Sequence, residues 1–169
     1  MQAENVLVVA VQRHILDTDR PFDAVLDGIY EGISQPDIST LFGQLAKSQS
    51  YDQFSSLVHQ AEGTAGLMRF MQLDLDEALT LDPEADSRQL VRLIAGNPVT
   101  MGQMTRNVPD AGSYAPVTIL VEETSDGRTR VAYDTVTSAL DPYHNDSAHA
   151  VAERLDDEVL TLLRHATSS

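Results

Sequence analysis

Methionines gather in two segments of this sequence that could border a ligand cavity. Met68, Phe70 and Met71 lie in an apolar run, and Met101 and Met104 lie in an expected short helix. Thioether side chains are flexible and adapt to irregular cavities and to varied ligands. Core packing explains the same pattern, and it is the favoured interpretation. The methionines are still the best indication of a small apolar or amphipathic ligand held between a sheet and helices.

Asn97 stands between Gly96 and Pro98, at the point where an expected strand ends. Its amide could lie at the mouth of such a cavity. Asparagine is also a good helix cap and turn residue, and this structural role is the favoured interpretation. The predicted ligand-binding residues are Asn97, Met71, Met101, Met104 and His144.

Carboxylates near residue 75 are poor metal ligands by their spacing. Asp74, Asp76 and Glu77 carry the oxygen atoms that calcium and magnesium prefer, but they lack the glycine turn and regular alternation of an EF-hand loop. The alternation more simply predicts a strand with Asp74 and Asp76 in water and with Leu73 and Leu75 facing the core.

Two histidines, His144 and His149, lie close together in the sequence, near Asp141 and Asp146. Their five-residue gap crosses an expected loop-to-helix junction and matches no helical spacing of zinc ligands. An exposed helix cap is the favoured interpretation. The sequence therefore predicts no metal site and no cofactor.

Several chemistries are excluded by residue type. Cysteine is absent, which removes disulfides, thiolate nucleophiles and sulfur-bound metals. Lysine occurs once, as Lys47 in a polar segment, and is interpreted as solvated. The sequence contains no nucleophile elbow, phosphate-binding loop or dinucleotide-binding glycine pattern. Catalysis of these familiar kinds is not predicted.

Charge narrows the range of partners. The 169 residues include 26 Asp and Glu but 11 Lys and Arg, for a net charge of -15. Nucleic-acid binding needs a basic stripe, and anionic membranes attract basic segments, so neither partner is expected. Glu4 precedes the first apolar run and no run of about 20 apolar residues follows, so a soluble, cytoplasmic protein is the default expectation.

Hydrophobic periodicity predicts one α+β domain over residues 1–169. The expected elements are a strand over 6–16, helices after Asp19, Pro36 and Ser50, strands over 67–75 and 90–95, a short helix from Asn97, a hairpin over 116–123 and 128–134, and a last helix from Asp146 or Ser147. Val151, Leu155, Val159, Leu162 and Ala166 should line the buried side of that helix. This order favours an antiparallel sheet covered on one face by helices.

The segment Leu93-Ile94-Ala95-Gly96-Asn97-Pro98, with Gly102 and Met104 after it, resembles the most diagnostic part of the domain of unknown function 302 family. Residues 115–123 and 131–134, with Gly127 between them, look like the strand pair that follows it there. The resemblance implies a TATA-binding-protein-like fold, in which a curved antiparallel sheet packs against a long C-terminal helix. It also implies a homodimer, and it implies no established activity.

The sequence departs from that family in two places. Residues 36–62 look like a helical insertion relative to shorter members. Leu75 stands where the family often has a histidine after the aspartate that Asp74 matches, so a role built on that pair is not carried over.

Three functions follow as hypotheses. The leading one is a non-catalytic homodimer that binds a small ligand between sheet and helices. The second is an acid–base enzyme with Asp74, Asn97 or His144 at a cleft near the end of the third strand. The third is a protein-interaction module that uses the helices of 36–62.

Overall fold

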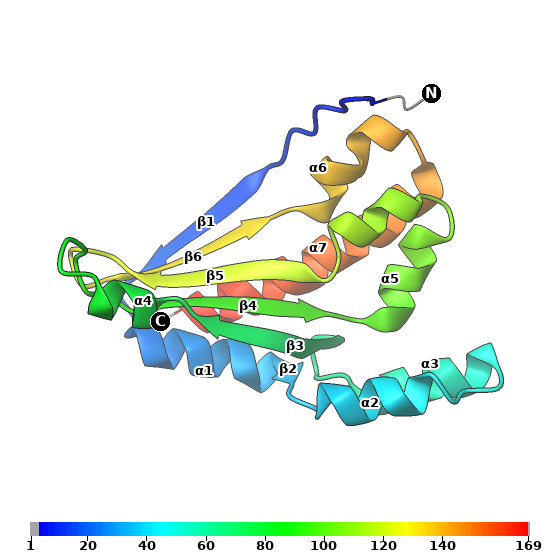
Figure 1. Cartoon of the computed structure of the whole chain (residues 1–169), viewed down its shortest axis with the longest axis horizontal. Coiled ribbons are helices and arrows are strands. Elements are labelled where there is room, and N and C mark those ends of the chain that lie inside the picture. The colour runs from blue at the N-terminus through cyan, green and yellow to red at the C-terminus, as the bar shows by residue number, and fades with distance from the viewer. Residues whose placement is uncertain (1–3, 169) are drawn as a thin grey trace.

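The computed structural model describes residues 4–168 as one sheet with helices packed on one face and at one end (Figure 1). Its strands are β1 (Arg13–Thr18), β2 (Ile33–Ser34), β3 (Leu67–Asp74), β4 (Leu90–Gly96), β5 (Val117–Glu123) and β6 (Thr129–Asp134). Its helices are α1 (Phe22–Gly32), α2 (Ile38–Leu45), α3 (Tyr51–Ala61), α4 (Asp76–Leu81), α5 (Pro98–Thr105), α6 (Val136–Leu140) and α7 (Asp146–Thr167), with 3-10 turns η1 (Pro109–Ser113) and η2 (Asp141–Tyr143).

The strand order is β1-β6-β5-β4-β3-β2, which confirms an α+β fold with a long C-terminal helix. The sheet is mixed rather than wholly antiparallel, because the two-residue β2 pairs in parallel with β3. Helices α2 and α3 form the crossover that a parallel pair requires. The sequence pattern did not show this short strand. The likeness to the TATA-binding protein stays a prediction.

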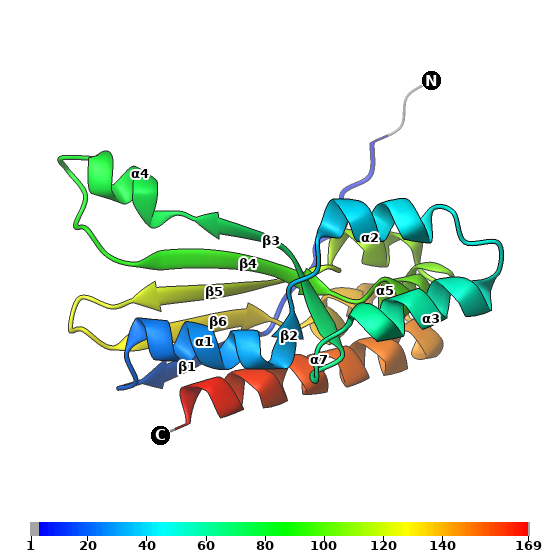
Figure 2. The same cartoon turned by 90° about the horizontal axis from the view of Figure 1, so that it is seen from below.

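One face of the sheet forms the main core. Side chains alternate between faces along a strand, and Val91, Leu93 and Ala95 of β4 point toward the helices and are buried. Figure 2 shows α1 and α7 side by side beneath this face. The predicted buried side of α7 is confirmed, and Leu160 and Leu163 are buried as well. The opposite face, called here the open face, lies away from α1 and α7, and α2 and α3 pack there against Met68 at the start of β3.

The first strand differs from its prediction. The apolar run 6–16 predicted a strand from Val6, but β1 begins at Arg13 and continues to Thr18. Arg13 pairs with Asp134, the last residue of β6, after which the chain turns into α6. Residues before Arg13 therefore have no neighbouring strand along that side. This leaves residues 4–11 extended and unpaired.

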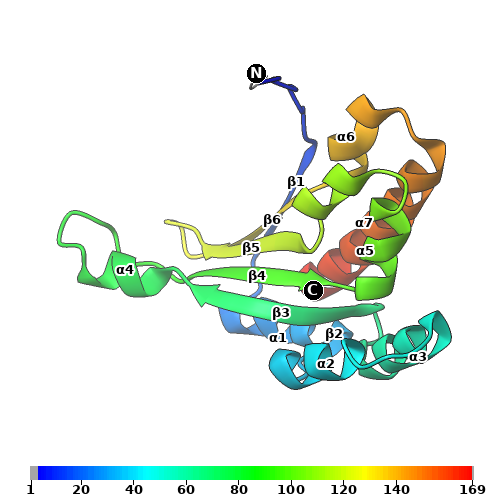
Figure 3. The same cartoon turned by 45° about the vertical axis from the view of Figure 1, so that its right-hand side comes forward.

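The end of β3 also differs. Leu73 and Leu75 were expected in the core, but each is 37% exposed. A register shift between Arg69 and Met71 changes the face that each side chain takes, and Leu73 then pairs with Arg92 on the open face. Beyond it, α4 and its loops project past the helix layer (Figure 3). The leucines there have no core to enter.

Helix caps follow the predictions in part. Ser50 and Asn97 accept backbone N–H groups as N-caps of α3 and α5, as expected. The cap of α7 is Asn145, not Asp146 or Ser147, and α1 begins after Pro21 without a side-chain cap. Between residues 4 and 168, every helix is too short or too polar to cross a membrane.

Candidate functional site

A cleft of about 800 Å³ lies where α1, α7 and the α3–β3 turn meet. Figure 2 shows these three segments converging near the junction of α1 and β2. We call it the α1–α7 cleft. Its lining comprises four glycines (28, 32, 63 and 66), four carboxylates (Glu31, Glu62, Asp157 and Glu158) and Thr64, Ala65, Thr161, Leu162 and His165. The lining combines small residues with negative charge.

Glycines let the walls of the cleft approach one another. A Cβ on Gly28 would lie 3.1 Å from the Cα of Ala166, so α1 and α7 pack at close range there. A Cβ on Gly63 would collide with backbone atoms of Gly32 and Ser34. The turn is pinned by hydrogen bonds from Ala65 N to Gly32 O (2.9 Å) and from Gly63 N to Leu67 O (2.8 Å). The cleft is thus bounded by fixed backbone.

Glu62 is held in place from both sides. Its Oε2 accepts a hydrogen bond from Asn97 Nδ2 at 2.6 Å, and its Oε1 lies 3.1 Å from His59 Nδ1. Glu62 follows α3 directly, so the helix end and the Asn97 amide together fix the carboxylate. This side chain was not singled out by the sequence, because nothing in its neighbourhood marks it as different from other surface glutamates.

Glu158 comes from the middle of α7 and approaches the same turn. A Cβ on Gly66 would lie 3.6 Å from its Oε2, and Gly66 has a φ of +72°, which favours glycine. Partial burial, and next the nearby charge of Glu62, raise the pKa of Glu158, and Arg154 opposes them. Between residues 4 and 168, no lysine or arginine forms an ion pair with Glu62 or Glu158. Two carboxylates thus share one edge of the cleft, with His59 beside Glu62 and Arg154 near Glu158 but, within the described residues, with no lysine or arginine in an ion pair with either.

Asn97 lies behind the wall of the cleft rather than at its mouth. It is 5% exposed, and its Oδ1 accepts from Val99 N at 2.9 Å as the cap of α5. Its Nδ2 donates to Glu62 and, at 2.9 Å, to Gly66 O. The strand-to-helix turn of Gly96, Asn97 and Pro98 is as predicted. Asn97 therefore affects the cleft indirectly, by holding Glu62 and Gly66 in place.

The other predicted ligand residues do not come together. Met104 is fully buried in the main core, and Met101 packs against that core. Met71 is 53% exposed and pairs with Ile94 on the open face. His144 is exposed, with a φ of 48°, just before the N-cap of α7. The N-cap lies about 20 Å along the helix from Glu158.

Two smaller hollows border other parts of the predicted site. One of about 350 Å³ lies between α5 and the α2–α3 region, against Val99 and Gly102. Another of about 390 Å³ lies on the open face beside Val11 and Arg92. Over residues 4–168, no group of three or more His, Asp or Glu side chains is arranged to hold a metal ion.

Comparison with known proteins places this geometry in a family. The model of the family described as "Domain of unknown function DUF302" matches residues 44–166. The crystal structure of an uncharacterized conserved DUF302 protein from Bacillus stearothermophilus is similar in fold, with a TM-score of 0.62 and 13% sequence identity over 91% of this chain and 97% of that one. Among curated proteins, none matches. The match over most of the sequence and the strand–Gly-Asn-Pro–helix junction together show that this chain belongs to the DUF302 family, for which no activity is established.

Proposed function

We propose that this protein is a non-catalytic homodimer that binds a small amphipathic ligand with a positively charged group in the α1–α7 cleft. One observation carries the proposal: Glu62 and Glu158 face the same glycine turn, and within residues 4–168 neither carboxylate forms an ion pair with a lysine or arginine. Partial burial, and next the repulsion from Glu62, raise the pKa of Glu158, and a ligand cation placed between the two carboxylates would oppose both effects.

The remaining lining suits the rest of such a ligand. Leu162 and Ala65 offer apolar surface beside the glycines, and Thr161 offers a hydroxyl. Small-molecule sites typically combine apolar walls with a few fixed polar groups. The net charge of -15 adds a field that draws cations toward the protein. The ligand class is therefore a short-chain amine rather than the wholly apolar compound that a methionine-lined cavity would favour.

Binding of simple amines tests the site. Thermal-shift and calorimetric titrations with n-butylamine, putrescine and choline should show stabilisation, whereas butyrate, of matched size and opposite charge, should show none. Glu158→Gln should abolish the effect. Glu84→Gln is the matched control, because it removes the same charge from an exposed loop residue far from the cleft. Equal responses to butyrate, or an unchanged response in E158Q, would overturn the site.

Exposed apolar side chains support the homodimer. Ile15 is 55% exposed and Met71 53% exposed on the open face, and Val6 and Val8 before β1 are more than 80% exposed. Ile15 and Met71 lie on strands that are separated by three others, whereas Val6 and Val8 lie together before β1, and exposed apolar side chains that gather in this way mark contact sites in soluble proteins. The mass of the purified protein, measured by light scattering, tests this part independently of ligand binding.

An acid–base enzyme is the second candidate, favoured by the same carboxylate pair. Two carboxyl groups whose pKa values differ because of their surroundings can act as acid and base. Glu158, with its raised pKa, would be the acid, and Glu62, held by Asn97 close to the end of β4, the base. Mass spectrometry of bound amines after incubation in D₂O and transfer back to H₂O separates the two functions, because recovery of unchanged ligand with no deuterium on carbon supports binding alone.

The helices of residues 36–62 are a third candidate, as a protein-interaction surface. Tyr51 is 64% exposed and Phe42 is 43% exposed. A second small core joins these helices to β3 and α5 through Leu41, Leu45, Val58, Met68 and Val99. We therefore expect deletion of 36–62 to disturb the fold, and Tyr51→Glu is the milder test. Loss of dimerisation in Y51E with an unchanged circular dichroism spectrum would favour this surface.

A further inference from the structure

We infer that residues 5–11 form an unpaired β-strand that pairs antiparallel with the same segment of a second copy of this chain. This segment is called the arm. The inference deepens the homodimer part of the proposed function, on which it rests, and assigns the interface.

The arm has the composition of a strand but lacks a partner. Its sequence Asn-Val-Leu-Val-Val-Ala-Val is rich in β-branched residues, which favour strands. Val6 is 85% exposed, Leu7 55% and Val8 83%. Within residues 4–168, no backbone group of residues 4–11 forms a hydrogen bond with another part of the chain. In Figure 3 the arm points away from the body of the protein.

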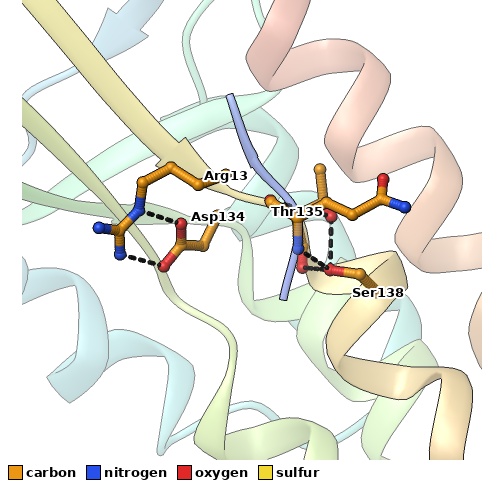
Figure 4. Close-up of polar contacts among 5 residues, drawn as sticks. Arg13, Asp134, Thr135 and Ser138 are labelled. Atoms are coloured by element: carbon orange, nitrogen blue, oxygen red, sulfur yellow. Dashed lines mark hydrogen bonds and ion pairs between the residues drawn. The ribbon is translucent and has the colours of Figure 1, made fainter. Parts of the chain in front are cut away.

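The base of the arm is clamped to the sheet (Figure 4). Gln12 N donates to Ser138 Oγ at 2.9 Å, and Thr135 N donates to Gln12 O at 3.0 Å. Arg13 adds a two-point ion pair, with Nε 2.6 Å and one terminal nitrogen 2.8 Å from the carboxylate oxygens of Asp134. The clamp fixes the direction in which the arm leaves β1, which lowers the entropy cost of pairing it.

The arm also continues an edge that is already free. β1 is the last strand on its side of the sheet and pairs with β6 alone. Edge strands expose a row of backbone donors and acceptors and readily add another strand. Pairing that starts in the arm can therefore extend into β1 and join two sheets.

The lack of charged residues in the arm favours a second copy of this chain as its partner. Two chains of charge -15 repel, so they must meet through segments without acidic clusters, and the arm has no charge between Glu4 and Arg13. Two-fold antiparallel pairing places a residue opposite itself. With Val9 as that residue, Leu7 faces Val11, and Glu4 faces His14 of the other copy. This register sets apolar groups against apolar ones and a carboxylate against an imidazole, with no like charges opposed.

Light scattering of the whole chain tests the interface. The wild type should be a dimer, and Val8→Lys should raise its dissociation constant about tenfold or more, because it brings two like charges together near the symmetry axis. Leu81→Lys is the matched control, since Leu81 (85% exposed) is about as exposed as Val8 (83%) but lies on α4. A monomeric wild type would overturn the homodimer itself. A dimeric wild type with a dimeric V8K would overturn the arm interface alone.

Cross-linking tests the register. The chain has no cysteine, so a single substitution gives an unambiguous disulfide. Mild oxidation of Val9→Cys should yield mostly covalent dimer, while Leu81→Cys should stay monomeric on a denaturing gel. A V8K monomer combined with a V9C variant that does not cross-link would show that the arm binds elsewhere on the partner, such as its open face, and would overturn self-pairing.

Discussion

Asn97 donates a 2.6 Å hydrogen bond from Nδ2 to Oε2 of Glu62, across 35 residues of sequence. The same amide donates to Gly66 O, and its Oδ1 caps α5 at Val99 N. One side chain therefore starts a helix and braces the acidic edge of the α1–α7 cleft. Helix capping and the support of a site are not alternatives at this position.

Variants at Asn97 separate its capping role from its bracing role. Asn97→Ala removes the cap and both donors, and we expect it to lower the free energy of unfolding by about 2–3 kcal/mol. Asn97→Asp keeps the capping oxygen but sets a carboxylate against Glu62. Urea unfolding should therefore show N97D gaining stability relative to N97A as the pH falls from 8 to 5. Parallel pH profiles for the two variants would contradict the bracing role.

Glu158 should make stability depend on pH. Its pKa is higher in the folded state than in the unfolded chain, so between those two values the folded state holds more protons and stability falls as the pH rises. Glu158→Gln removes the ionising group and with it this fall in stability. In urea unfolding from pH 4 to 8, E158Q should be the more stable protein at neutral pH, and the difference should fade below the ordinary value of 4.5. The charge-matched E84Q should show no such trend.

Three glycines should respond differently to alanine. Gly63→Ala would force a Cβ into backbone atoms of Gly32 and Ser34, so we expect a loss of more than about 3 kcal/mol or no folding. Gly32→Ala meets the flexible end of Leu162 instead and should cost about 1–3 kcal/mol. Gly43, inside α2, has open space, and Gly43→Ala should add about 0.5–1 kcal/mol. Thermal unfolding gives the order of stability of the three variants. A G63A variant as stable as the wild type would contradict the close approach of Gly63 to the backbone of Gly32 and Ser34.

Asp156 should be the most sensitive polar residue of α7. This buried carboxylate accepts from Tyr133 Oη (2.6 Å), Val136 N and Thr137 N (2.9 Å each), and so fastens α7 to β6 and to the start of α6. Asp156→Ala leaves two buried donors and the half-buried Thr137 N unpaired and should cost about 3–5 kcal/mol. Tyr133→Phe should cost about 1–2 kcal/mol. The double variant should lose less than the sum of the two, and simple additivity would show that the groups do not interact.

The sequence predicted elements where a periodic apolar pattern meets a local signal. The buried side of α7, the Ser50 and Asn97 caps and the hairpin around Gly127 were all visible in this way. The start of β1 and the face of Leu73 were not, because each depends on where a partner strand ends or shifts register. The start of a strand and the face of its side chains are set by how it pairs with its neighbour, and the sequence of the strand alone does not contain this information.

The site was harder to predict than the fold. Sequence reasoning favoured methionines and His144, which the structure spreads over the core, the open face and the far end of α7. Glu62 and Glu158 look like ordinary surface glutamates until α7 packs against the α3–β3 turn. Gly63 and Gly66 were the available signal, since their spacing marks a tight turn, but a turn alone does not say what it faces.

The α1–α7 cleft is assembled from segments that are synthesised at very different times. Its glycine walls come from residues 28–32 and 63–66, whereas one of its two facing carboxylates arrives with residues 157–165. During translation the complete cleft cannot form until α7 has emerged and docked. A chain whose α7 has not yet formed should therefore not bind the proposed ligand, and occupancy of the cleft would report that α7 has been made and has packed against α1.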